Sequence, residues 1–253
     1  MSDFVRHEAC PECGSSDNLG VFSDGHKFCF GCGYYESGDA SIANYRSKYD
    51  TRKADVVNST LPPDFDYDIQ KEGLTWLSKY GLLQKEVINH RIGWSKEGIY
   101  FKNKEIQVNP LLVFPIYGAE GQLLMWQGRN FGTVGPKYIT RGAKDIYHIL
   151  GDTTKTDVLI LTEDLISAIK VSRICPAMPL WGSYLSAGIA KTLSERFDKV
   201  ILWLDKDKAQ EAVKMASNLS YLFKEGCSGF RTERDPKEYL TTDILKMVET
   251  IRN

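Results

Sequence analysis

Apolar residues form two uninterrupted runs in the second half of the chain, and an acidic residue follows each run. The runs are Val-Leu-Ile-Leu at 158–161 and Val-Ile-Leu-Trp-Leu at 200–204. Runs of this kind, without polar alternation, are typical of parallel strands that are covered on both faces. Between them, residues 165–173 and 187–197 have apolar side chains at helical spacing. The pattern predicts alternating strands and helices around a mostly parallel sheet.

The segments on either side of this region have a different periodicity. Residues 64–150 are expected to form a small α+β subdomain. Its expected elements are two short helices between 74 and 88, divided at Gly81, and strands at 98–101, 111–117 and 122–127. Near the C-terminus the apolar spacing predicts a helix over 208–223 and a closing helix over 243–251.

Composition limits the class of protein. The chain has 253 residues, of which 42% are apolar and 26% charged, so it can bury one good core and a smaller unit. No apolar run approaches the length of a membrane span, and the N-terminus does not resemble a signal peptide. We therefore expect a soluble cytoplasmic protein without a membrane partner. The net charge of -1 indicates that any contact with nucleic acid is local.

Four of the six cysteines are grouped near the N-terminus. Cys10 and Cys13 form one CxxC pair, Cys29 and Cys32 form another, and 15 residues separate the pairs. This spacing is typical of a structural zinc site with four thiolate ligands. We therefore predict a zinc ribbon over residues 1–36. The single cysteines at 175 and 227 are expected to be core residues.

Aromatic residues surround the predicted zinc site. Phe22 and Phe28 are expected to supply part of the small core, which so short a ribbon otherwise lacks. His26 and the remaining aromatic residues leave a second interpretation open, in which they stack on unpaired bases. Residues 37–63 are polar, without sustained apolar spacing, and are expected to be a flexible linker.

Carboxylates follow the two apolar runs. Glu163 follows the first run, and Asp205 and Asp207 follow the second. In parallel sheets the working groups lie at the carboxyl ends of the strands, so these three side chains should converge. Carboxylates that converge repel one another unless a cation lies among them, and hard oxygen ligands suit magnesium or manganese. Asp235, which precedes Pro236, is either a helix cap or a further carboxylate of this site.

A basic stretch lies ahead of the acidic sheet. Two interpretations are open: the stretch is a solvated loop, or it binds a triphosphate or the backbone of a template. Its cations are Arg129, Lys137, Arg141 and Lys144.

The acidic pattern resembles a known family. Glu163, followed about forty residues later by Asp205-x-Asp207, resembles the TOPRIM domain of topoisomerases, DnaG-type primases and several nucleases. The order of zinc ribbon, polar linker, mixed unit and TOPRIM domain is similar to the primase half of short-tailed-phage primase-helicases and, more distantly, to bacterial DnaG-type primases. The resemblance implies an α/β architecture with a zinc ribbon at 1–36, a linker at 37–63, a mixed subdomain with the basic loop at 64–150, and a TOPRIM domain at 151–253.

The resemblance also implies an activity. The expected reaction is the synthesis of RNA primers on single-stranded DNA from ribonucleoside triphosphates, in the cytoplasm or in a host cell if the protein is phage-encoded. Magnesium would be held by Asp205 and Asp207, with Asp235 as a further candidate, and Glu163 would act as general base or as a ligand. Asp24 and His26 match residues with which the family reads the template.

Three features depart from the family. The family usually has Gly after the catalytic Glu and Asp four residues beyond it, whereas this chain has Asp164 and Ser167. Gln210 replaces the Gly that often follows the second acidic motif. No GxxxxGK[ST] phosphate loop is present, so the expected helicase partner is a separate protein or a missing part of a longer chain.

Two other functions remain open on the sequence. A TOPRIM nuclease would use the same acids to place a water molecule. A recombination mediator of the RecR type combines zinc and TOPRIM without chemistry, although those proteins have a helix-hairpin-helix before the zinc site.

Overall fold

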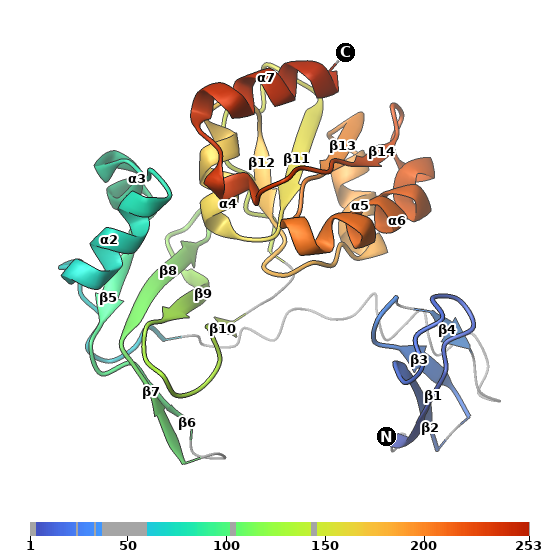
Figure 1. The fold of residues 1–253 in the computed structure, drawn as a ribbon, viewed down its shortest axis with the longest axis horizontal. Helices are drawn as coiled ribbons and strands as arrows, with labels where there is room; N and C mark the ends of the chain where they lie inside the picture. The colour runs from blue at the N-terminus through green and yellow to red at the C-terminus, as the bar shows by residue number, and fades with distance from the viewer. Residues whose placement is uncertain are drawn as a thin grey trace. The chain divides into compact units, whose positions relative to one another are not determined.

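The structure is a computed structural model that describes residues 4–23, 25–32, 34–36, 60–101, 105–142 and 146–252. The chain divides into two compact units, Met1–Asp55 and Val56–Asn253 (Figure 1). The predicted linker at 37–63 lies outside the described residues except for 60–63, so it stays a prediction. Among the described residues, no helix is both long and apolar enough to cross a membrane.

The first unit is a small antiparallel sheet. Its strands pair in the order β1-β2-β3-β4, with bounds Phe4–Glu8, Leu19–Phe22, Lys27–Cys29 and Tyr35–Glu36. A tight turn joins β2 to β3, and Gly25 occupies it with a φ of 82°, a conformation that glycine adopts without strain. Cys10, Leu19 and Cys29 are buried, and Tyr34 packs on them. Phe22 and Phe28 are only half-buried, so the cysteines supply more of this core than the sequence indicated.

The second unit begins with an antiparallel sheet. Its strand order is β10-β9-β8-β5, with bounds Tyr138–Gly142, Leu123–Asn130, Leu111–Tyr117 and Gly93–Ser95. Two helices accompany it, α2 over Lys71–Lys79 and α3 over Gln84–Asn89. A separate two-stranded ribbon is formed by β6 (Ile99–Phe101) and β7 (Ile106–Val108). The two predicted helices and their division near Gly81 are confirmed.

The basic stretch is more ordered than the sequence indicated. It was expected to be rich in loops, but Arg129 lies on β9 and Arg141 lies on β10, which pairs with β9 along its whole length. The loop is confined to the connection between these strands. Cross-strand hydrogen bonds therefore hold the basic residues on a hairpin, which apolar periodicity alone did not reveal.

The parallel sheet follows. Its order is β12-β11-β13-β14, with bounds Ala177–Pro179, Val158–Thr162, Lys199–Leu202 and Cys227–Gly229, and every neighbouring pair is parallel. The predicted strands at the two apolar runs are confirmed. The helices are α4 (Leu165–Ser172), α5 (Ala187–Ser194), α6 (Ala209–Leu219) and α7 (Thr241–Arg252), and short 3₁₀ turns cover Lys206–Lys208, Ser220–Leu222 and Pro236–Glu238.

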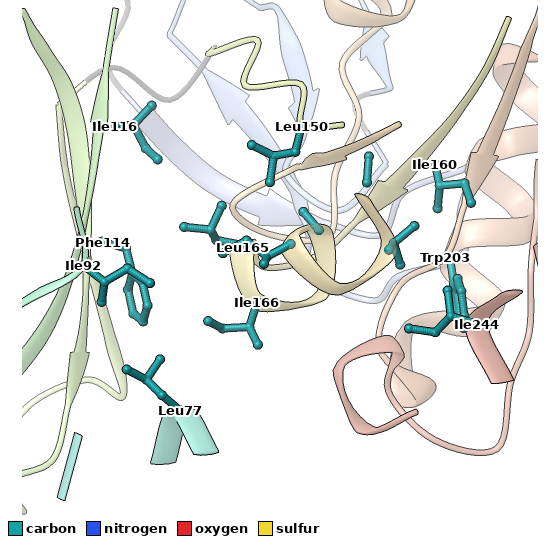
Figure 2. Packing of buried hydrophobic residues seen from close by; sticks show 14 of the residues in the cluster. Leu77, Ile92, Phe114, Ile116, Leu150, Ile160, Leu165, Ile166, Trp203 and Ile244 are labelled. Carbon is teal, nitrogen blue, oxygen red and sulfur yellow. The ribbon is translucent and has the colours of Figure 1, made fainter. Parts of the chain in front are cut away.

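Both faces of the parallel sheet are buried, as the uninterrupted apolar runs predict. On one face Ile160 and Ile201 pack with residues of α4 and α7, and on the other Leu159 and Leu161 pack with residues of α5 and α6. The first of these cores continues into the antiparallel sheet, because α4 lies between the two sheets (Figure 2). The packing of α4 thus fixes the basic hairpin relative to the parallel sheet.

Candidate active site

The carboxylates lie at the point where the parallel sheet reverses its strand order. From β11 the chain passes to β12 on one side and then to β13 on the other. Crevices for ligands form at such a switch point, at the carboxyl ends of the strands. Glu163 and Asp164 directly follow β11, and Asp205 follows β13 after two buried residues. Glu163 and Asp205 thus lie at the carboxyl ends of neighbouring strands, and their predicted role in binding a metal ion stays a prediction.

A buried lysine lies among the acids. The Lys237 ammonium donates to Asp205 Oδ2 at 2.6 Å and to Asp164 Oδ2 at 2.8 Å, and it lies 3.2 Å from Asp235 Oδ2. Its side chain is only 10% exposed. No motif or spacing in the sequence pointed to this residue. The requirement for a cation among converging carboxylates was the signal that would have directed attention to it.

Two of the acids have both carboxylate oxygens occupied. Asp164 caps α4, because its Oδ1 accepts a hydrogen bond of 2.9 Å from the backbone N–H of Ser167. Asp235 Oδ1 accepts from the backbone N–H of Lys206 at 3.0 Å. The second oxygen of each faces Lys237. Asp235 thus lies beside Lys237 and also begins the turn at Pro236–Glu238, and its predicted role as a metal ligand stays a prediction.

Two other carboxylate oxygens are buried without a hydrogen-bond partner among the described residues. They are Glu163 Oε2 and Asp205 Oδ1. A buried acceptor without a donor is costly unless an ion or water completes it. Asp207 is exposed, and its charge acts on Glu163. Hard, anionic oxygens such as these are the ligands that magnesium and manganese prefer.

Burial and the charges of neighbouring acids raise the pKa values of Glu163 and Asp205. The pKa of Glu163 is raised by burial and by the charges of Asp164 and Asp207. Burial raises the pKa of Asp205 to about 7, and the charges of Asp164 and Asp235 add to the rise while Lys237 opposes it. The pKa of Lys237 rises even though burial lowers it, because Asp164 and Asp205 outweigh the burial. The site therefore favours a further positive charge near Glu163 and Asp205.

Arg129 faces the acidic centre through Tyr138. Its guanidinium lies 5.2 Å from the centre of the Tyr138 ring, and its Nε and Nη1 atoms are buried without a hydrogen-bond partner in the described part of the chain. The pKa of Tyr138 rises to about 12 through burial and then through the charge of Asp164. This coupling places the ring within electrostatic range of the acids. Buried guanidinium donors that have no partner in the described part of the chain suit phosphate oxygens.

The other predicted cations are placed differently. Lys137 is exposed, with its ammonium 5.7 Å from the Tyr138 ring. Arg141 packs 4.7 Å from the Phe101 ring and lines a cavity of about 660 Å³ with Trp126. Because alternate residues of a strand face opposite sides, Arg141 lies on the other side of β10 from Tyr138. Lys144 lies outside the described residues.

The four cysteines near the N-terminus form a cluster in the first unit, with a sulfur spacing that suits tetrahedral coordination of a metal ion. Their four Sγ atoms lie within 4.8 Å of one another, with Cys10 and Cys32 3.6 Å apart and Cys13 and Cys29 3.7 Å apart. Zinc bonded to four thiolates at about 2.3 Å separates the sulfurs by about 3.8 Å. The cluster therefore fits zinc, as the spacing predicted.

His26 lies on an aromatic surface of the same unit. Its ring stacks on Phe22 with centroids 4.2 Å apart and planes 7° apart, and Tyr35 lies 5.8 Å away. This places His26 beside flat rings of the kind on which bases stack, and its predicted contact with the template stays a prediction. Asp24, the other predicted template residue, lies outside the described residues.

Comparison with solved structures identifies the fold, although no family model matches the sequence. The primase fragment of the bacteriophage T7 primase-helicase is 17% identical, with 98% of both chains covered and a TM-score of 0.50. The zinc-binding and RNA polymerase domains of the Aquifex aeolicus primase are 15% identical over 98% of this chain and 79% of that one, with a TM-score of 0.52.

The third comparison covers a smaller share of the chain. A DNA primase domain from Pseudomonas aeruginosa is 16% identical over 71% of each chain, with a TM-score of 0.54. The chain has the primase fold. This agreement confirms the predicted architecture of a zinc-binding unit followed by a primase core. Within that fold, Glu163 and Asp205 occupy the switch point of the parallel sheet.

Proposed function

We propose that the protein is a DNA primase, which joins ribonucleoside triphosphates into short RNA primers on single-stranded DNA. The observation that carries the proposal is the pair of buried, unpartnered oxygens, Glu163 Oε2 and Asp205 Oδ1, at the switch point of a primase fold. Such oxygens support a divalent-ion site, and phosphoryl transfer depends chiefly on positioning and on charge neutralisation.

Each residue of the centre has a role in this reaction. Asp205 and Asp207 would hold magnesium, which would supply the positive charge that neutralises the triphosphate. Glu163 would be a further ligand, or would act as general base and accept the proton of the attacking 3′-hydroxyl. Arg129 binds phosphate oxygens with the donors that lack protein partners. A bond forms between the 3′-oxygen and the α-phosphorus as the bond to pyrophosphate breaks.

The zinc unit has a separate role in the proposal. Zinc held by Cys10, Cys13, Cys29 and Cys32 stabilises the ribbon, and His26 contacts bases of the template. Lys137 and Arg141 bind the nucleic-acid backbone away from the acids. A replicative helicase unwinds the template.

The test is a primer-synthesis assay with single-stranded DNA of varied sequence, labelled ribonucleotides and magnesium. We expect labelled oligoribonucleotides. The double variant Asp205→Asn/Asp207→Asn should lower their yield by at least about 100-fold, because the charges that act on the transferring phosphate are lost. Its zinc content should remain unchanged. Asp198→Asn is the matched control, since Asp198 forms a surface ion pair with Lys224 and should retain full activity.

The other outcomes identify the rival functions. Shortened DNA without labelled RNA would contradict the proposal in favour of a nuclease, in which the same acids place water. DNA binding without either product would favour the non-catalytic mediator. Full activity of the Asp205→Asn/Asp207→Asn variant would show that the acidic centre is not the site of synthesis.

A further inference from the structure

Lys237 is fixed from several directions. It lies in the 3₁₀ turn Pro236–Glu238, directly after a proline that restricts the backbone. Its carbonyl oxygen accepts a hydrogen bond of 2.6 Å from the ammonium of Lys170, which is buried in α4. Its own ammonium is held by carboxylates from three separate segments. These contacts hold Lys237 in a fixed position within the site, unlike a lysine on the surface.

The carboxylate oxygens fall into two groups around Asp205. Asp164 Oδ2, Asp205 Oδ2 and Asp235 Oδ2 all face the Lys237 ammonium. Asp205 Oδ1 and Glu163 Oε2 have no partner among the described residues. Asp205 thus gives one oxygen to the Lys237 ammonium, and its other oxygen has no partner in the described part of the chain.

The side with the lysine has no oxygen left for another ion. Asp164 Oδ1 is used by the N-terminus of α4, and Asp235 Oδ1 is used by the backbone N–H of Lys206. A divalent ion there would have to displace the ammonium, because both would require the same three oxygens. An ammonium at 2.6 to 3.2 Å from three carboxylates already supplies the positive charge.

We propose that Lys237 takes the place of a second metal ion, so that the acidic centre binds a single divalent ion on the side of Glu163, Asp205 and Asp207. Lys237 is a positioning residue: it holds Asp205 so that Oδ1 faces that ion. The inference rests on the proposed function for its meaning in catalysis. The number of ions bound, however, is independent of whether primers are made.

The test counts bound manganese on the full, zinc-loaded chain by electron paramagnetic resonance titration. Manganese prefers oxygen ligands and leaves the four thiolates to zinc. The Asp205→Asn/Asp207→Asn variant measures the background from other surface carboxylates. Above that background, we expect one manganese ion in the unaltered protein. In Lys237→Met we expect two, because three carboxylates then lack their cation.

Two further variants separate the role of the charge from general damage. Lys237→Arg restores a cation and should again bind one manganese ion. Lys206→Ala removes a lysine from the same region whose side chain is 60% exposed and pairs with the exposed Glu233, and it should leave the count at one. If Lys237→Met does not fold, the count is made on Asp164→Asn/Lys237→Met, which has one unpaired charge fewer and should also bind two.

The outcomes are distinct from those of the primer assay. Two manganese ions in the unaltered protein, or one in the folded Lys237→Met variants, would overturn the role of Lys237 even if primers are made. One ion in the unaltered protein and two without the lysine would support that role even if no primer appears. In that second case, only the proposed function would fail.

Discussion

At the scale of single residues, Asp164 shows how a neighbour decides the role of a carboxylate. It directly follows the catalytic candidate Glu163, and by sequence it is the acid nearest to the position that Ser167 occupies. In the structure one of its oxygens caps α4 and the other pairs with Lys237. Ser167 is fully buried in α4, and its hydroxyl has no hydrogen-bond partner among the described residues. Both carboxylate oxygens of Asp164 are thus occupied, one by the N-terminus of α4 and the other by Lys237.

His148 should make the protein sensitive to acid. Burial and, to a smaller extent, the charge of nearby His90 lower the pKa of His148 to about 4, whereas a histidine in an unfolded chain has a pKa of about 6.5. The unfolded chain therefore takes up the proton first. The contribution of neutral His148 to the free energy of unfolding is present above about pH 6.5. It is lost as the pH falls towards 4, with a slope of up to about 1.4 kcal/mol per pH unit. His148→Phe should flatten this dependence in urea unfolding at pH 7.5, 6 and 5.

A comparison of His148→Phe with the unaltered protein isolates the contribution of His148 to the pH dependence of stability. Asp205 changes stability in the opposite direction over part of the range, because its raised pKa makes the folded state hold a proton that the unfolded chain releases. That contribution is common to both proteins and cancels. Equal slopes for His148→Phe and the unaltered protein would contradict the prediction.

At the scale of elements, Arg173 at the end of α4 joins segments that are distant in the sequence. Its guanidinium pairs with both carboxylate oxygens of Glu86 on α3, at 2.7 and 2.6 Å. It also donates to the carbonyl of Gly81 and to the hydroxyl of Thr241 at the start of α7, each at 2.9 Å. A single side chain therefore connects the helices of the mixed subdomain with two helices around the parallel sheet.

Loss of this connection should destabilise the second unit. Arg173→Met should lower the free energy of unfolding by about 3 to 5 kcal/mol, because it leaves the largely buried carboxylate of Glu86 without its partner. The measurement is urea unfolding followed by far-UV circular dichroism. Lys224→Ala, which breaks an exposed ion pair with Asp198, is the control and should cost less than about 1 kcal/mol. Similar losses in the two variants would show that Arg173 acts only as a surface residue.

At the scale of the whole molecule, the two units are stabilised by different means. The first has a core of only a few buried residues around the cysteine cluster. The second has extended cores on both faces of its parallel sheet, and one of them continues to the antiparallel sheet. Small domains without enough apolar surface depend on metals or disulfides. The stability of the first unit should therefore depend on zinc, and that of the second should not.

Removal of zinc should unfold residues 4–36 selectively. Structural zinc supplies about 10 to 16 kcal/mol of apparent binding free energy in small zinc domains, and this energy is part of folding. Hydrogen exchange after chelation should show lost protection in β2 and β3 and unchanged protection in β11 and β13. Cys13→Ser should reproduce this pattern, whereas Cys227→Ser, at a buried position on β14, should retain zinc. Loss of protection in β11 on chelation would contradict independent stabilisation.

The sequence by itself determined the two central strands of the parallel sheet, β11 and β13, the cysteine cluster and the position of the acids at strand ends. These features follow from local spacing and from apolar runs that only a sheet buried on both faces can accommodate. It did not indicate β10 or β12, because short strands with mixed polarity depend on their partners for hydrogen bonds.

The tertiary structure alone decided which charges meet. Lys237 lies 73 positions from Asp164 and 32 from Asp205 in the chain, and only the packing of three segments brings their atoms within 3 Å. The same packing separates Arg129, which faces the acids through Tyr138, from Arg141, which faces Phe101. Sequence spacing could place carboxylates at one edge of a sheet, but the cation among them came from a distant turn whose position depends on the whole fold.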